Sequence, residues 1–554
     1  MAAEKIIVRV GEEKKQAILS VFRNTVMVVL SAFFFSLSFP GFFSEKGMPL
    51  MAFLFFIPLV PVLQKCSWTA SVLYGWIHAS VSYVLFNYWL ADFHPLTIII
   101  VPLIYVGYYS FLFPLLKAGV TLFPRSGFLW QALIWTGYEF VKSKGFLAYS
   151  YGTVGSAFYQ WPVLVRSASL TGIWGLSFLA VVTGAWLGNA FDLKKVCKSL
   201  KEWCFYQRAG GGIAIYALVL VLYGTFSAVD YSDSPHFQIA LTQHNADSWQ
   251  GGYKAYKSNY LALRDLSLQS QEHKDPDLIV WPETAFVPSI YYHKTYKQNQ
   301  LSLSLVEDLE DFLSTQEVPY LLGNDDARKE LSKKSADLER VDYNALLLYD
   351  HGWQDLYRKK HLVPFTEHFP YEEEFPLVYQ MLLDADTHFW KKGDAFSTID
   401  VGKFKIGTPI CFEDTFGYIS RAFVNAGANI IVNVSNDAWS GSVVAERQHF
   451  MLSVFRAGEN RRTMVRSTNS GITAWVDPNG VIQEELPPFI LDVLVVDVPV
   501  YTNSRTLYTL WGDWFAWGCL IVALLGLLMG FLRRLTIQYR SRKIEKQVYD
   551  RGTV

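Results

Sequence analysis

The chain has 554 residues, of which 51% are hydrophobic and 16% aromatic, so it is too long for one ordinary domain and too apolar for an ordinary soluble protein. Its formal net charge of -1 provides no basic surface of the kind that nucleic-acid-binding proteins carry. The composition therefore argues against nucleic acid as a partner and predicts a division into membrane-embedded and aqueous parts.

Residues 1–230 carry most of the apolar sequence. A membrane-spanning helix needs about 20 mostly apolar residues, and seven segments before residue 230 fit this pattern. The first is not a cleavable signal peptide, because a long polar stretch precedes it and the sequence FPGFF at its end lacks a small-residue cleavage site. The seven segments are expected near residues 20–39, 49–65, 68–90, 97–118, 128–142, 168–191 and 211–229.

Residues 231–505 have the mixed, charged composition of an aqueous domain. Within them, apolar runs rich in β-branched residues alternate with helical stretches, and this alternation predicts a layered α/β sandwich. The runs are HFQIALTQ, DPDLIVWPE, VPYLLGND, YNALLLYD, FKIGTPICFE, ANIIVNVSN and RTMVRSTN. No long Gly- or Ser-rich linker separates this domain from the hydrophobic segments, so we expect it to lie close to the membrane.

Residues 506–554 are expected to contain an eighth spanning helix, near 511–532, and a basic cytoplasmic tail. Basic residues that flank spanning helices stay on the cytoplasmic side. With seven crossings before it, the aqueous domain is then expected on the far side, which in a bacterium is the periplasm. No ATP or NADH pool is available there, so no soluble cofactor is expected. The basic flanks are Lys5, Arg9, Lys14, Lys15, Lys194, Lys195, Lys198, Lys201, Arg208, Arg533, Arg534, Arg540, Arg542, Lys543 and Lys546.

Cys411 is the one cysteine, of five, that lies in the aqueous stretch. It has no partner there for a disulfide and no Cys-x-x-Cys spacing for a metal, which leaves either an inert buried thiol or a reactive one. The segment FKIGTPICFED predicts a strand that ends at this cysteine and can present it to a cleft. Attack on a carbonyl carbon requires the thiolate, and therefore a neighbouring base or cation.

Two other predicted strand ends offer such groups. Glu283 closes DPDLIVWPE, and YRKKHLVPFTE, with Lys359 and Glu367, follows YNALLLYD. Taken singly, Glu283 is typical of a solvated turn and Lys359 of an exposed basic face. In the order WPE, YxKxHLVPFxE and CFE, the motifs resemble the Glu-Lys-Cys triad of the nitrilase, or carbon-nitrogen hydrolase, superfamily.

The resemblance extends to the superfamily branch fused to membrane helices, the apolipoprotein N-acyltransferases. Its further motifs are NVSNDAWSG at residues 433–441, QH at 448–449, RAGE at 456–459 and RSTNSG at 466–471. It covers essentially the whole chain and implies about eight transmembrane helices with a nitrilase-like αββα sandwich. It also implies acyl transfer from a membrane phospholipid to the N-terminal α-amine of the diacylglyceryl-cysteine of an apolipoprotein, at the bacterial inner membrane.

The same resemblance implies a role for each motif residue. Cys411 would be the nucleophile that forms a thioester, Glu283 the general base, and Lys359 the oxyanion stabiliser together with the backbone N–H of Phe412. Glu367 would orient Lys359. Ping-pong kinetics would follow, and neither a metal nor a cofactor is implied.

Both implied substrates carry acyl chains, so we expect apolar walls around the cleft. Residues 286–292 and 375–383 could be mobile apolar loops there, or ordinary core elements, the latter being favoured for the first stretch. The aromatic run at residues 146–151 could line the acyl entry or belong to an interfacial belt. Candidates for substrate binding are Glu413, Trp439, Phe365, Tyr291, Tyr292 and Glu139, the last an ionisable residue near the end of the fifth segment.

Three positions depart from the family pattern without removing a triad member. Thr366 stands where glycine is usual, Phe412 where tyrosine is usual, and Phe146-Leu147-Ala148 where Phe-Pro-Trp is frequent. A membrane-tethered amidase or nitrilase would share the first half-reaction, although a water-soluble amide would not require eight helices. A transporter or scaffold with an inactive domain is the remaining alternative.

Overall fold

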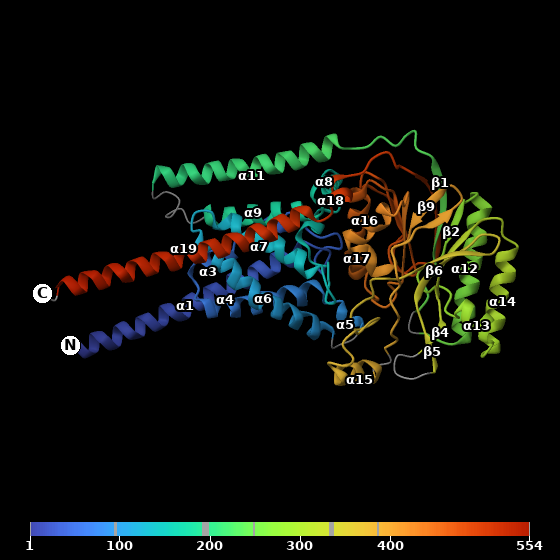
Figure 1. Ribbon diagram of the computed structural model, residues 1–554, viewed down its shortest axis with the longest axis horizontal. Helices are drawn as coiled ribbons and strands as arrows, with labels where there is room; N and C mark the ends of the chain where they lie inside the picture. Colours follow the sequence, from blue (N-terminus) through green and yellow to red (C-terminus); the bar gives the residue numbers. More distant parts are fainter. Residues whose placement is uncertain are drawn as a thin grey trace.

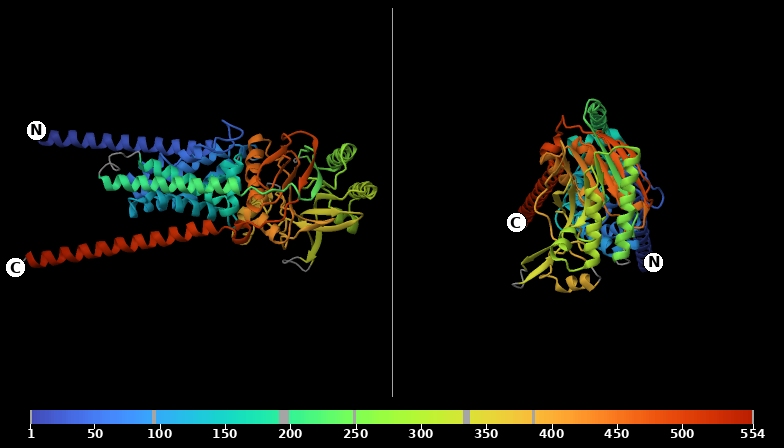
Figure 2. Two further views of the ribbon diagram at one scale, coloured as in Figure 1. Left: turned by 90° about the horizontal axis from the view of Figure 1, so that it is seen from above. Right: turned by 90° about the vertical axis from the view of Figure 1, so that its right-hand side faces the viewer.

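The computed structural model describes residues 2–552 except 94–96, 191–198, 248–249, 332–336 and 385–386. A helical bundle occupies one end of the long axis and a β-rich domain the other, and both chain termini lie at the far end of the bundle (Figures 1 and 2). The expected basic flank at Lys194, Lys195 and Lys198 lies outside the described residues.

The bundle is made of the helices before the β-rich domain and of a short and a long helix after it. Its elements are α1 (Ala2–Leu37), α2 (Met51–Leu54), α3 (Leu59–Lys65), α4 (Trp68–Phe86), α5 (Leu90–Phe93), α6 (Thr97–Leu122), α7 (Gly127–Lys142), η1 (Val154–Phe158), α8 (Pro162–Thr171), α9 (Trp174–Ala190), α11 (Leu200–Phe226), α18 (Leu507–Trp511) and α19 (Trp514–Gly552). Within the described residues, four segments are long and apolar enough to cross a membrane, or five if α8 and α9, bent by 108°, form one span. The four are Glu12–Leu37, Ile98–Leu122, Leu200–Phe226 and Trp514–Ile544.

This number is lower than the eight spans expected from hydropathy, because several expected segments are short or carry polar residues. Residues 49–65 form the two short helices α2 and α3, and α7 has 16 residues. The helix α4 buries polar side chains such as His78 and Ser82. A helix packed against other helices does not need an apolar surface on every side, so hydropathy alone does not identify these elements as spans.

The β-rich domain contains two six-stranded sheets in its described part. The first has the order β14-β1-β2-β3-β6-β7 and the second β13-β12-β11-β10-β9-β8, each with parallel strands at its centre. The strands of the first sheet are β1 (His236–Gln243), β2 (Leu278–Val280), β3 (Tyr320–Asp325), β6 (Asn344–Tyr349), β7 (Trp353–Arg358) and β14 (Asp492–Pro499). Those of the second are β8 (Ile399–Val401), β9 (Phe404–Gly407), β10 (Ile430–Ser435), β11 (Met464–Thr468), β12 (Ala474–Val476) and β13 (Ile482–Glu485). A separate hairpin joins β4 (Arg328–Leu331) and β5 (Leu338–Val341).

Helices cover both outer faces of the paired sheets, which confirms the expected α/β sandwich. Leu263 of α12 (Tyr253–His273) and Leu309 of α14 (Gln300–Ser314) share a core with Ile279 of the first sheet. Against the second sheet pack α16 (Gly417–Asn425) and α17 (Val443–Asn460). The remaining helices of this domain are α13 (Ile290–Tyr296), α15 (Pro376–Asp384) and the 3-10 turn η2 (Cys411–Thr415).

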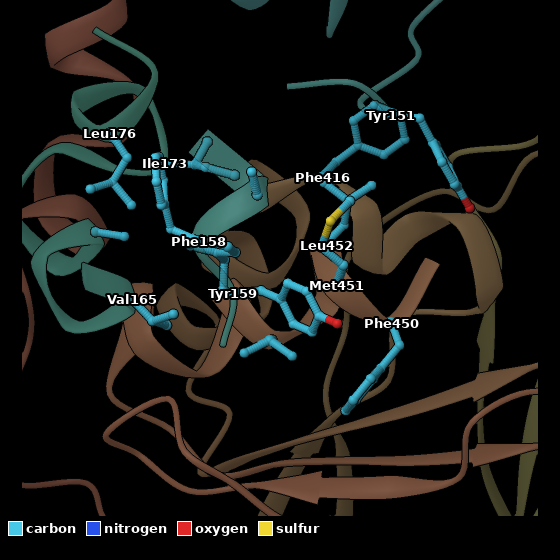
Figure 3. Close-up of a cluster of buried hydrophobic side chains, with 14 of the residues drawn as sticks. Tyr151, Phe158, Tyr159, Val165, Ile173, Leu176, Phe416, Phe450, Met451 and Leu452 are labelled. Atoms are coloured by element: carbon cyan, nitrogen blue, oxygen red, sulfur yellow. The ribbon is translucent and has the colours of Figure 1, made fainter. Parts of the chain in front are cut away.

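The α16 and α17 layer faces the membrane bundle (Figure 1). Met451 and Leu452 of α17 lie among apolar side chains of the bundle, such as Tyr159 and Ile173, in a buried cluster, whereas the neighbouring Phe450 points toward the strands (Figure 3). Burial of such apolar area is the main stabilising force in protein association. The sandwich therefore has one helix layer against the bundle and the other, with α12 and α14, facing away from it.

Candidate functional site

Cys411 stands at a sharp turn directly after a strand. β9 ends at Gly407, a bridge between Ile410 and Val434 continues the pairing beside β10, and η2 begins at the cysteine. The φ angle of Cys411 is +50°. The left-handed region costs a non-glycine residue roughly 1–2 kcal/mol and persists only where the surroundings fix the turn.

Burial favours the neutral form of the Cys411 thiol. Only 9% of the residue is exposed. Burial raises the pKa of the thiol well above its usual value, the negative charge of Glu283 raises it further, and the charge of Lys359 opposes both. A base must therefore take the proton as the sulfur attacks.

Lys359 lies between two carboxylates. Its Nζ is 3.0 Å from Oε1 of Glu283 and 2.8 Å from Oε1 of Glu367. Burial alone would lower the pKa of Lys359, but the two carboxylates raise it well above its usual value. An ammonium group has three N–H donors, so two bonds within the described residues leave one donor for an oxygen of the substrate.

Glu283 is held by two further donors, of which Asn436 lies in the NVSNDAWSG motif and Asn344 lies outside the motifs that the sequence pointed to. Asn344 Nδ2 donates to Oε1 at 2.7 Å, and the backbone N–H of Asn436 donates to Oε2 at 2.8 Å. Each carboxylate oxygen has about two acceptor positions. Among the described residues, Lys359 and Asn344 fill both acceptor positions on Oε1, and the Asn436 N–H fills one on Oε2. One position on Oε2 is left for the proton of a thiol.

Glu367 is fixed from its own loop. The backbone N–H of Val363 donates to Oε2 at 2.8 Å, while Oε1 accepts from Lys359. Burial raises the pKa of Glu367, and Lys359 opposes this shift. The expected role of Glu367 in orienting Lys359 thus has a direct geometric basis.

Glu413 joins the loop of Lys359 to the turn of the nucleophile. It is fully buried, and its carboxylate accepts hydrogen bonds from the backbone N–H groups of Lys360, His361 and Ile410 and from the Tyr357 hydroxyl, all at 2.9–3.0 Å. Burial raises the pKa of Glu413 to about 7. Glu413, a candidate for substrate binding, thus ties the loop of Lys359 to the turn of Cys411 through these hydrogen bonds.

Phe412 is the second residue of η2. The first backbone N–H groups of a helical turn have no hydrogen-bond acceptor inside the turn. The N–H of Phe412 can therefore be offered to an oxyanion that forms at the sulfur. No group of three or more His, Cys, Asp or Glu side chains is arranged as a metal site in the part of the chain that the structure describes.

Aromatic residues connect the site to the bundle. The ring of Phe146, from the loop after α7, lies 5.2 Å from the ring of Phe365 and 5.4 Å from that of Tyr371. Phe365 itself adopts a positive φ of 65° in the loop before Glu367. The ring centroid of Trp439 lies 5.7 Å from that of Trp89, a residue that follows α4. Both Phe365 and Trp439 thus face the membrane part of the chain.

Three candidates are placed elsewhere. Tyr291 and Tyr292 of α13 lie against the β4–β5 hairpin, with guanidinium groups of Arg328 and Arg340 over their rings. Glu139 is buried inside the bundle, where its Oε1 accepts from Trp135 Nε1 and the Val154 N–H, both at 2.9 Å. The structure does not bring any of these three side chains into contact with the triad.

The two apolar stretches differ in exposure. In residues 286–292, Phe286 and Ile290 are buried, as favoured from the sequence. In residues 375–383, which include most of α15, none of the helix residues is buried, and Leu377 and Met381 are 81% and 67% exposed. An uncovered apolar helix of this kind marks an interaction surface.

Two family models match separate parts of the chain. Residues 31–186 match the model of the apolipoprotein N-acyltransferase N-terminal domain, and residues 238–505 match that of carbon-nitrogen hydrolase. Apolipoprotein N-acyltransferase 1 of Treponema denticola is 44% identical, over 91% of this chain and 95% of that one. Apolipoprotein N-acyltransferase 1 of Treponema pallidum is 38% identical, over 88% and 92%. An amidase from Nesterenkonia sp. is 18% identical, with a TM-score of 0.34 over 49% of this chain and 94% of that one.

Proposed function

The chain belongs to the apolipoprotein N-acyltransferase family, and we propose that it transfers a fatty acyl chain from a membrane phospholipid, through a thioester at Cys411, to an apolipoprotein. The acceptor is the N-terminal α-amine of a diacylglyceryl-cysteine, and the step completes lipoprotein maturation. As an acyltransferase it exchanges an ester for a thioester and then for an amide, and neither exchange requires a redox group or a nucleotide.

In the first half-reaction, Glu283 takes the proton of Cys411 as the sulfur attacks the ester carbonyl of the phospholipid. The free N–H of Lys359 and the backbone N–H of Phe412 stabilise the oxyanion. The C–O bond then breaks, Glu283 returns the proton to the leaving alcohol, and a lysophospholipid departs. Cys411 keeps the acyl chain as a thioester.

In the second half-reaction, the α-amine of the acceptor attacks the thioester carbonyl. Glu283 now takes a proton from the attacking amine, and the same donors stabilise the second oxyanion. The C–S bond breaks, the amide is released, and the thiolate recovers a proton from Glu283. One carboxylate thus serves both half-reactions, because its protonation state is restored after each.

The observation that carries the proposal is the position of the thiol turn on the bundle side of the sandwich. η2 contacts α17, and α17 packs on α8 of the bundle. A lipid substrate needs an apolar approach from the bilayer, and the exposed side chains of α15 with the aromatic group around Phe146 supply apolar surface for it. Hydrolysis of a water-soluble amide would require neither.

The enzyme is proposed to lie in the bacterial inner membrane with its catalytic domain in the periplasm. The bundle supplies four or five clear spans, and α2, α3, α4 and α7 are proposed to complete eight crossings inside it. Arg540, Arg542 and Lys543 in the distal part of α19 support a cytoplasmic location for that end, since basic flanks remain in the cytoplasm.

Mass spectrometry of the acyl-enzyme tests the proposal. Protein incubated with phospholipid alone is expected to gain one acyl chain on Cys411 and to lose it on addition of a diacylated lipopeptide, which becomes triacylated. Discharge to water at the same rate with and without lipopeptide would favour an amidase-like hydrolase. Formation of triacylated product by a Cys411→Ala variant would exclude the thioester mechanism.

A further inference from the structure

One residue of α17 holds this helix to the ends of two bundle helices. The side-chain amide of Gln448 donates to the carbonyl oxygens of Pro40 and Phe86, at 2.7 Å and 2.9 Å, and accepts from Trp89 Nε1 at 3.1 Å. Pro40 lies just after α1, and Phe86 is the last residue of α4. Gln448 is fully buried, so the register of α17 on the bundle is fixed by a polar contact without access to water.

The next residue, His449, belongs to a buried cluster of four charges. Its Nε2 lies 2.9 Å from Oδ1 of Asp414, and its Nδ1 lies 2.9 Å from Oδ1 of Asp437. Arg466 reaches the remaining oxygens of the same two carboxylates, at 2.7 Å and 2.6 Å. Both ring nitrogens of His449 face carboxylates, and Nδ1 also lies 3.0 Å from a guanidinium nitrogen of Arg466. The two carboxylates favour the imidazolium form of the ring, and in that form the four-charge cluster has no net charge.

The four-charge cluster includes residues from the two segments that position Cys411 and Glu283. Asp414 lies in η2, three residues after Cys411, and is therefore part of the turn that presents the thiol and the Phe412 N–H. Asp437 directly follows Asn436, whose backbone N–H binds Oε2 of Glu283. A shift of His449 would move the nucleophile relative to its base.

We propose that α17 couples the docking of the catalytic domain on the membrane bundle to the alignment of Cys411 with Glu283. Gln448 binds the bundle, and His449 positions the turn that carries the thiol. This inference rests on the proposed acylation of Cys411. Neither residue touches the reacting atoms, so both are positioning residues. Misplacement of reacting groups by about 1 Å can cost 100-fold in rate, whereas lipid affinity depends on other surfaces.

The first test is the His449→Gln variant, which keeps hydrogen-bonding capacity but leaves the four-charge cluster with a net charge of -1. Formation of acyl-Cys411 from phospholipid vesicles is expected to slow by about tenfold or more per folded molecule, with KM for the lipid unchanged within twofold. The His449→Gln/Asp437→Asn double variant restores neutrality and is expected to recover part of the rate. His236→Gln, which removes an exposed His–Asp pair, is the matched control.

The second test is Gln448→Glu, which retains the acceptor for Trp89 but places a carboxylate oxygen against two carbonyl oxygens. The same slowing of acylation at unchanged KM is expected, although this side chain makes no contact with the four-charge cluster. The coupling would be overturned if folded Gln448→Glu protein formed acyl-Cys411 at the wild-type rate. It would also be overturned if the variant changed only the KM for the lipid. Absence of acyl-Cys411 on the wild-type enzyme would overturn the proposed function, and this inference with it.

Discussion

Nζ of Lys359 and Oε1 of Glu283 lie 3.0 Å apart in a site from which water is largely excluded. Glu283 offers a proton acceptor and Lys359 an N–H donor, and the charges of both act on the Cys411 thiol. Glu367 holds Lys359 from the other side at 2.8 Å. The predictions below follow from this arrangement and from the surfaces around it.

Replacement of Lys359 by methionine removes the cation from between Glu283 and Glu367. Two buried carboxylates cannot both remain ionised at close range, so one takes up a proton and the base is weakened. Loss of an oxyanion donor alone costs about 100- to 1000-fold in rate, and we expect at least this loss in acyl-Cys411 formation. Lys405→Met, in an exposed pair with Asp400, should retain wild-type activity. Near-normal acylation by Lys359→Met would contradict the assignment.

Glu283→Gln should change thiol reactivity and catalysis in opposite directions. The charge of Glu283 raises the pKa of Cys411, so its removal lowers that pKa and should speed alkylation by iodoacetamide at pH 8. Acylation by phospholipid should fall by about 100-fold or more, because no base remains to accept the proton. Parallel changes in the alkylation and acylation rates would show that Glu283 does not act as the base.

His449 should make folding stability dependent on pH above neutrality. Burial and Arg466 work to lower the pKa of His449, but Asp437 and Asp414 raise it to about 9, from an ordinary value of 6.5. Its stabilisation is therefore complete below about pH 6.5 and is lost as pH rises through about 9, an effect of roughly 3 kcal/mol. The thermal unfolding midpoint in detergent, followed from pH 6 to 10, should decline in the wild type and stay flatter in His449→Gln. An identical decline in both would refute this account.

The exposed apolar side chains of α15 should matter for lipid substrates only. Burial of a leucine is worth about 1.5–3 kcal/mol, so Leu377→Asp/Met381→Asp should reduce acylation from long-chain phospholipid vesicles about tenfold or more. Acylation by a short-chain, water-soluble ester should be unaffected. Leu301→Asp, at an exposed leucine of α14 on the opposite helix layer, provides the control. If the double variant lost acylation activity equally with the long-chain phospholipid and the short-chain ester, α15 would not contact the lipid substrate.

The proposed topology predicts where reporter proteins work. Alkaline phosphatase inserted at about residue 330, in the β4–β5 hairpin, should be active, because it needs export from the cytoplasm. The same enzyme fused after residue 552, at the end of α19, should be inactive. A cytoplasm-restricted reporter that works at residue 330 would invert the orientation.

The strands that carry the site were predictable because the apolar runs of the sequence are short, β-rich and end in polar motifs. DPDLIVWPE contains β2 and ends at Glu283, and FKIGTPICFE contains β9 and carries Cys411 after it. The rings of Tyr291 and Tyr292, named as candidates for substrate binding, pack against Arg328 and Arg340. Nearness to Glu283 in sequence does not decide on which side of a turn a helix packs. Hydropathy also identified more spans than length and composition support, because α4 and α7 pack with polar side chains inside the bundle.

The sequence by itself determined the residue types of the reaction, the order of their motifs and the family to which the chain belongs. Only the tertiary structure decided which groups share a hydrogen bond: Lys359 and Glu283 are 76 positions apart, and Gln448 meets Pro40 across 408. Such contacts depend on how strands and helices pack in three dimensions, and a spacing along the chain does not encode a distance across a fold. The four-charge cluster behind Cys411 became visible for this reason only when η2, β10, α17 and β11 were seen together.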